Sequence, residues 1–120
     1  MLILDLRFKT VPVQITGEDG VKHDYTLRML SAAERDDYLQ ALSKRTQVKQ
    51  VDGKTSATIT SFKGMQAELV GLCLRDESGN AIEQSVLQSW PGPVMGALYA
   101  ECGKLNDVGD EKKAADAGKD

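Results

Sequence analysis

The side chains that could carry acid–base chemistry in this chain of 120 residues are few. His23 is its one histidine, and the nearest acidic residue, Asp24, falls on the opposite face if this stretch is a strand. Base catalysis also needs a nucleophile and a group that orients the histidine, and the sequence offers neither beside it. We therefore expect His23 to be a structural or surface residue, and we expect no enzymatic activity.

Metal and cofactor sites have equally little support. The adjacent acids Asp36 and Asp37 would point about 100° apart on a helix, and the stretch DESGN lacks the alternating oxygen ligands of a calcium loop. Cys73 and Cys102 are far apart in the sequence, and neither belongs to a closely spaced pair of the kind that zinc needs. The glycines form no phosphate-binding pattern. We expect no cofactor, solvated acids and two buried, reduced thiols.

Charge and hydropathy limit the possible partners. Eighteen acidic residues against fifteen basic ones give a formal net charge of −3, so the chain has no broad cationic field for nucleic acid or anionic lipid. The N-terminal stretch MLILDLRFK is too short and too charged for a secretion signal, and no apolar run reaches the roughly 20 residues of a membrane span. These features predict a cytoplasmic protein that binds neither nucleic acid nor membrane.

The first third of the chain has the period of strands. Residues 2–8 alternate as in a half-buried strand, with apolar side chains at Leu2, Leu4, Leu6 and Phe8. Residues 11–30 predict a β-hairpin whose loop is bracketed by Gly17 and Gly20. A small antiparallel sheet is therefore expected at the N-terminus.

Helical patterns follow the predicted hairpin. Ser31 and Glu34 form a capping-box pattern, so a helix is expected to begin at about Ala32 and to end near Lys44 and Arg45. Residues 46–58 read as a mobile surface connection with one Asp-Gly turn. The strongest helical period covers residues 59–73 and predicts a central core helix, with apolar positions at Ile59, Phe62, Met65, Leu69, Leu72 and Cys73.

The last elements are marked by tryptophan and proline. Residues 81–90 predict a short helix or extended segment with Ile82, Val86 and Leu87 facing inward. Trp90 precedes Pro91, which ends that segment, and Pro93 suits the first turn of a helix that runs to about Leu105. Trp90 is interpreted as a core side chain. The predicted fold is one α+β domain over residues 1–107, with a small sheet, three to four helices and a disordered tail at 108–120.

Three stretches, taken in order, resemble the tail assembly chaperones of long-tailed bacteriophages. They are YTLRMLSAAERDDYLQAL, MQAELVGLCLRDESGNAI and LQSWPGPVMGALYAECGKLND. In that family a strand runs into a capped helix, a second helix leads into an acidic-Gly-Asn turn, and a helix that opens with proline closes on Leu-Asn. The matching positions here are 30–36, 68–80 and 91–106.

The resemblance implies a non-enzymatic protein that is absent from the finished virion. Such a protein binds the long, largely helical tape measure protein through helix-in-groove contacts and keeps it soluble while tail tube protein is recruited. Self-association into a ring or spiral would follow from head-to-tail interfaces. The family also uses a programmed ribosomal frameshift, for which the codons of residues 117–119 or of Lys112 and Lys113 are candidates that the nucleotide sequence would test.

The partner-binding residues that we predict lie on the first helix: Arg35, Tyr38, Leu39 and Leu42. If so, Leu39→Asp and Leu42→Asp should weaken partner binding without unfolding the domain. The alternative is that this apolar stripe simply packs on the central helix. For the function, the alternative is a small virion structural protein, such as a tail tube or connector subunit, which would remain in purified particles.

Overall fold

A three-stranded antiparallel sheet forms the N-terminal part of the computed structural model, which describes residues 1–59 and 64–108. Strands β1 (Thr10–Thr16) and β2 (Lys22–Arg28) form the predicted hairpin, and the short β5 (Leu74–Arg75) joins the other side of β2. The hairpin loop is closed by a hydrogen bond from the N–H of Gly17 to the carbonyl oxygen of Val21. Gly20 has φ +79°, a conformation that suits glycine. The α+β class is confirmed.

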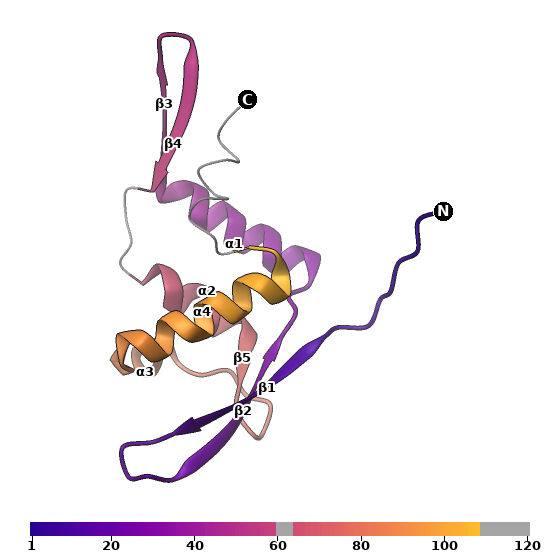
Figure 1. Cartoon of the computed structure of the whole chain (residues 1–120), viewed down its shortest axis with the longest axis vertical. Helices are drawn as coiled ribbons and strands as arrows, with labels where there is room; N and C mark the ends of the chain where they lie inside the picture. The colour runs from indigo at the N-terminus through magenta and orange to yellow at the C-terminus, as the bar shows by residue number, and fades with distance from the viewer. Residues whose placement is uncertain (60–63, 109–120) are drawn as a thin grey trace.

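Residues 1–9, which we call the N-terminal arm, run out from β1 without forming the predicted strand (Figure 1). The exposed fraction of its apolar side chains ranges from 57% at Phe8 to 111% at Met1. A strand needs a neighbour for its backbone groups, but β2 ends at Arg28, so among the described residues nothing pairs with residues 1–8. The half-buried strand predicted for residues 2–8 is therefore wrong.

Helix α1 (Ala32–Lys44) begins with the predicted capping box. The N–H of Glu34 donates to Ser31 Oγ, and Glu34 Oε1 accepts from the N–H of Ser31 at 3.1 Å. The same carboxylate forms a two-pronged ion pair with Arg28 of β2, with an Nη2–Oε2 distance of 2.6 Å. These bonds, the one to Arg28 first, lower the pKa of Glu34 to about 2. Glu34 thus fastens the start of α1 to the end of the hairpin.

Glu34→Gln is expected to lower the free energy of unfolding at neutral pH by about 1–2 kcal/mol, because it weakens charged hydrogen bonds at a partly solvated site. The folded pKa of Glu34 lies below its ordinary value, so this stabilisation is present above about pH 4.5 and is lost as the pH falls towards 2. Urea unfolding at several pH values measures the difference. Glu101→Gln, at an exposed pair with Lys104, is the control. The same dependence on pH in Glu34→Gln and in the unmodified chain would contradict the assignment.

A second hairpin replaces the predicted mobile connection at residues 46–58. Strands β3 (Thr46–Val51) and β4 (Lys54–Ile59) pair antiparallel through the two-residue turn Asp52-Gly53. Both turn residues have positive φ, +53° and +76°, as a type I′ hairpin turn requires. In Figure 1 this hairpin extends away from the helices, beyond the C-terminal end of α1. The Asp-Gly pair is typical of such a turn, but the strands on either side of it are too polar to show a clear apolar alternation.

The central helix is shorter than predicted. Helix α2 spans Met65–Cys73, after Gly64 with φ +73°, whereas Ile59 ends β4 and Phe62 lies outside the described residues. The predicted helix over residues 59–73 is therefore wrong in its first part. Its central position is confirmed, because α2 contacts α1, α3, α4 and β2.

Two helices complete the domain: α3 (Gln84–Ser89) and α4 (Gly92–Asn106). Leu87 is fully buried and Ile82 partly buried, but Val86 is exposed, so one of the three side chains predicted to face inward does not. Trp90 is extended between the helices and packs on the core, with its ring edge-on to Tyr25 at a centroid distance of 5.8 Å. Pro93 lies in the first turn of α4, as predicted.

Asp107 and Val108 close the end of α4, and Val108 is the first residue of the predicted tail. Asp107 adopts a left-handed conformation, φ +54°, and the N–H of Val108 donates to the carbonyl oxygen of Gly103. Val108 is 5% exposed and belongs to the core. The predicted domain boundary after residue 107 is thus at least one residue too early. Residues 109–120, with the candidate frameshift positions, lie outside the described part of the chain.

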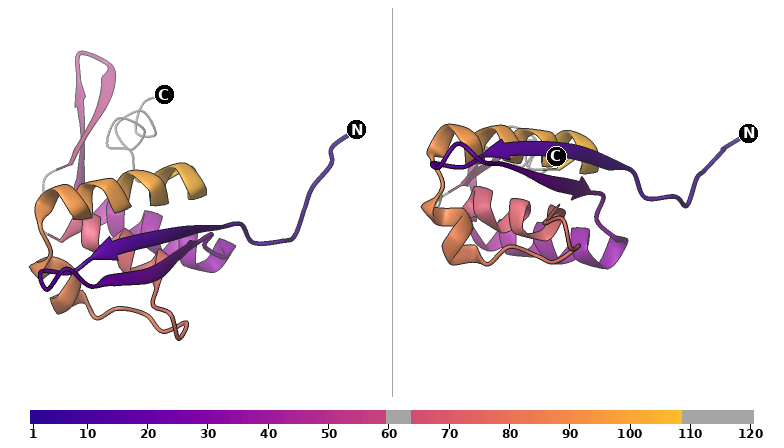
Figure 2. Two further views of the ribbon diagram at one scale, coloured as in Figure 1. Left: turned by 60° about the horizontal axis from the view of Figure 1, so that its bottom comes forward. Right: turned by 90° about the horizontal axis from the view of Figure 1, so that it is seen from below.

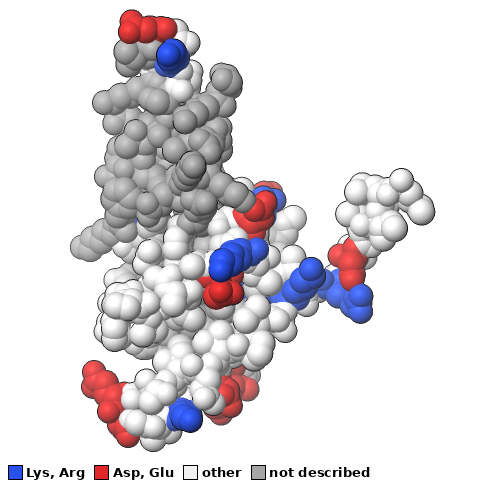
Figure 3. Space-filling view, viewed as in Figure 1, with Lys and Arg blue, Asp and Glu red and all other residues white. Residues whose placement is uncertain are grey.

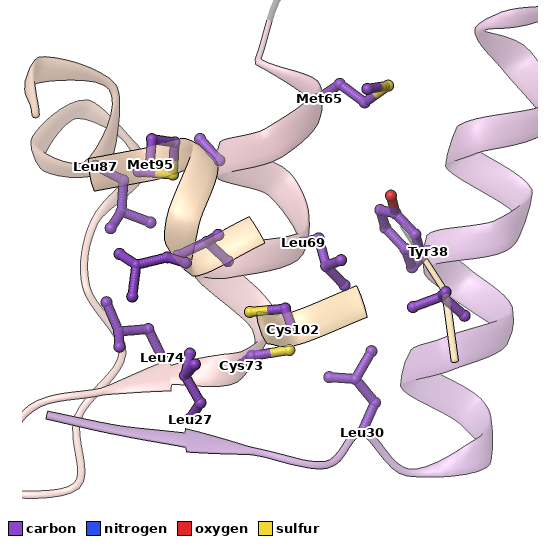
Figure 4. Close-up of a cluster of buried hydrophobic side chains, with 14 of the residues drawn as sticks. Leu27, Leu30, Tyr38, Met65, Leu69, Cys73, Leu74, Leu87, Met95 and Cys102 are labelled. Atoms are coloured by element: carbon purple, nitrogen blue, oxygen red, sulfur yellow. The ribbon is translucent and has the colours of Figure 1, made fainter. Parts of the chain in front are cut away.

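Figure 2 shows the sheet and the helices from two further sides. Side chains from the sheet and from all four helices gather in the core (Figure 4). Figure 4 shows the thiols of Cys73 on α2 and Cys102 on α4 close together at its centre. Both are free and buried, as predicted. Their mutual hydrogen bond, and then burial, raises the pKa of the Cys102 thiol well above its usual range. Cys102 therefore stays protonated.

Asn106, in the middle of this core, joins the end of α4 to the segment between β2 and α1. Its Oδ1 accepts from the N–H of Leu30 at 2.7 Å, and its Nδ2 donates to the carbonyl oxygen of Cys102 and to Cys73 Sγ. The side chain thereby satisfies a buried backbone group between β2 and α1 from the last turn of α4. Asn106 is a polar core residue that the apolar patterns did not point to.

Candidate binding surfaces

The residues that were considered for acid–base and metal chemistry can now be placed in the fold. His23 is exposed on β2, opposite Ile15 of β1. In this part of the chain, no group of three His, Cys, Asp or Glu side chains lies close enough to hold a metal ion. Most of the described part of the face seen in Figure 3 is neither basic nor acidic. The surfaces that remain to be considered are those that could contact another protein.

The predicted contact residues on α1 divide between the surface and the core. Tyr38 and Leu42 are 2% and 8% exposed and pack in the core, so their assignment to a partner surface is wrong. Residues four apart lie on one helix face, and that face of α1 covers α2. Arg35 and Leu39 lie on the exposed side. Leu39 is 38% exposed, and one such leucine is ordinary for a protein surface.

An open groove of about 750 Å³ lies between α1, α2 and the segment that leads into α3, and we call it the α1–α2 groove. Its lining includes Tyr38, Leu72 and Ile82, which are buried or partly buried. Burial raises the pKa of Tyr38 above its usual range, so the ring stays neutral. Leu72 and Ile82 therefore offer apolar surface to a partner, whereas the ring of Tyr38 is almost fully buried.

Charged and amide side chains complete the lining of the α1–α2 groove. Arg45 Nη2 lies 3.0 Å from Glu68 Oε2, which links α1 to α2, and Asp37 is exposed on α1. Gln84 donates from Nε2 to the carbonyl oxygen of Ala67 at 2.9 Å and so fixes the start of α3 against α2. Sequence patterns missed this groove because its walls come from three separate segments.

A smaller hollow of about 460 Å³ lies between α2, α3 and the start of α4. Met65, Leu87, Trp90 and Met95 are among its lining residues. Trp90 thus has a partly exposed side in addition to its contact with Tyr25. This hollow is a second apolar depression on the helical part of the domain.

Comparisons with known proteins add no relationship: no family model, no curated protein and no solved structure matches the chain. Within the described ranges, none of the helices has the length and apolar character that crossing a membrane requires. The functional argument therefore rests on the residues and on the geometry described above.

Proposed function

We propose that this chain is a tail assembly chaperone of a long-tailed bacteriophage, which binds the tape measure protein and keeps it soluble. One support is the order of the three stretches that resemble this family. The first falls on the capped start of α1, the second runs along α2 into the turn at Gly79, and the third includes α4 and closes on Asn106. These are positions where the chain must cap, turn or close its core.

The observation that carries the proposal is the α1–α2 groove. An amphipathic helix binds by laying its apolar face into such a groove while its polar face stays in water. The partly buried Leu72 and Ile82 suit an apolar stripe, and the charged residues of the lining suit its polar flanks. A tape measure protein exposes stripes of this kind before the tail tube encloses it. The groove thus replaces the α1 stripe as our proposed contact surface.

Co-expression with the tape measure protein of the same phage tests the proposal. We expect the tape measure protein to be soluble only in the presence of this chain and to be captured with it by affinity pull-down. Purified virions should lack the chain. Its presence in virions at a fixed copy number, with no effect on tape measure solubility, would instead support a virion structural protein.

A pair of charge reversals tests the groove itself. Asp37→Lys is expected to reduce capture of the tape measure protein at least severalfold, because Asp37 lines the groove. Asp36→Lys changes the same charge on the adjacent exposed residue, which is not part of the lining, and should leave capture nearly unchanged. Thermal melts should be similar for both variants. Equal capture by both would exclude the groove as the contact surface.

A further inference from the structure

The N-terminal arm carries apolar side chains that the domain leaves exposed. On β1, the residues Val11, Val13 and Ile15 pack against the core, and all have odd numbers. The apolar side chains of the arm stand mainly at even positions: Leu2, Leu4, Leu6 and Phe8. Since successive side chains of a strand alternate, a regular continuation of β1 would turn these four away from the domain's own core. Their burial requires another surface.

Among residues 1–59 and 64–108, no strand pairs with the outer edge of β1 and of the arm. The N–H of Met29 donates to the carbonyl oxygen of Lys9, and the N–H of Gly17 donates to that of Val21. In an antiparallel ladder, these two bonds mean that the odd-numbered residues of β1 point their N–H and C=O groups towards β2. The even-numbered residues point theirs away from β2, to the outer edge. Pro12 stands at an even-numbered position and has no N–H, so it cannot donate a hydrogen bond at the outer edge of β1. Outward pairing is thus favoured only before Pro12.

The charges of the arm select a second copy of the chain as the pairing strand. When two identical strands pair antiparallel about a two-fold axis, one residue lies opposite itself. An axis at Asp5 opposes two aspartates, and an axis at Arg7 opposes two arginines. An axis at Leu6 instead places Asp5 of each copy opposite Arg7 of the other. Opposite charges in facing positions stabilise a strand pair, and like charges destabilise it.

The axis at Leu6 also satisfies the other constraints. If the even residues carry the backbone bonds, Asp5 and Arg7 occupy the positions where facing side chains approach most closely. The pairing ends where Leu2 faces Thr10, before Pro12 would have to donate. All the large even apolar side chains of both arms then lie on one face of the ribbon, with Leu4 opposite Phe8 and Leu6 opposite Leu6.

We propose that the N-terminal arm is a self-association element, and that two copies of the chain dimerise by antiparallel pairing of their arms about a two-fold axis at Leu6. In the single chain, Asp5 and Arg7 form an exposed ion pair with each other at 2.7 Å, so dimerisation exchanges two such contacts, one within each copy, for two between the copies. This two-fold contact differs from the head-to-tail contacts of a ring or spiral. It does not depend on the tape measure protein.

Disulfide trapping tests the register in the whole chain. Leu6→Cys should form a covalent dimer under mild oxidation, because facing Cα atoms in a backbone-bonded pair are about 5.5 Å apart, within reach of a disulfide. Leu4→Cys is the matched control. Each introduced cysteine would face Phe8 of the other copy and would lie four residues along the strand from the other copy's introduced cysteine. We expect cross-linking at least tenfold faster for Leu6→Cys. Equal rates, or no dimer from either variant, would overturn the proposal.

Charge reversal tests the pairing without an introduced cysteine. Asp5→Arg and Arg7→Asp should each weaken dimerisation about tenfold or more, measured by analytical ultracentrifugation, because each places like charges opposite one another twice. The double exchange restores opposite charges and should return the dissociation constant to within about threefold of the original. A dimer that is unaffected by the single reversals, or one that the double exchange does not recover, would overturn the proposal. The arm is exposed, so the thermal melt of the domain should stay unchanged.

Discussion

Replacing Leu42 by aspartate is expected to unfold the domain or to lower its melting temperature by about 20 °C or more. Leu42 is 8% exposed and packs in the core with Tyr38. Burying a carboxylate there without a partner costs about 4 kcal/mol or more, a large part of the 5–15 kcal/mol that usually holds a domain folded. Circular dichroism melts measure the effect. This outcome reverses the expectation drawn from the α1 stripe alone.

Leu39→Asp is the matched control for that substitution. It introduces the same charge on the same helix, but Leu39 is 38% exposed, so the carboxylate can stay hydrated. We expect the melting temperature to change by only a few degrees. Similar melts for Leu39→Asp and Leu42→Asp would mean that α1 does not turn its Tyr38–Leu42 face to the core.

Asn106→Ala is expected to lower the free energy of unfolding by about 2–4 kcal/mol. The substitution leaves the buried N–H of Leu30 without its acceptor, removes the two bonds from Nδ2 and opens a small cavity beside Cys73. Chemical unfolding measures the loss. Hydrogen exchange at the Leu30 amide gives a local measure, because that amide should exchange much faster in the variant.

Asn80→Ala provides the comparison for the asparagine. Asn80 is exposed in the turn after β5, and its replacement should cost less than about 0.5 kcal/mol. If the two alanine variants were equally stable, or if the exchange rate at Leu30 did not change in Asn106→Ala, the link between the end of α4 and the segment before α1 would be wrong.

Local chemistry explains which elements could be predicted. The capping box of Ser31 and Glu34 and the positions of Trp90 and Pro93 act within a few residues, and the structure confirms them. The first hairpin also has a regular alternation and a glycine-bounded loop. The arm has the same alternation, but a strand requires a neighbouring backbone that its own residues cannot supply.

The remaining errors arise where a local signal was weak or where contacts are distant. The Asp52-Gly53 turn indicates a hairpin, but the polar strands around it lack a clear apolar period. Tyr38 and Leu42 have the same spacing whether a partner or α2 covers them. The α1–α2 groove depends on α1, α2 and the segment before α3, and the bond between Asn106 and Leu30 spans 76 positions. Such contacts depend on how the helices pack.

The bond from Asn106 to Leu30 also has a consequence for synthesis on the ribosome. The last turn of α4 supplies Asn106, and Val108 covers the core just beyond it, so the first hairpin and α1 cannot reach their final packing until these late residues emerge. A product that stops before α4 would leave Cys73 and Leu30 uncovered and exposed to proteases. A chain that stops before Asn106 therefore lacks a contact on which the packing between the first hairpin and α1 depends.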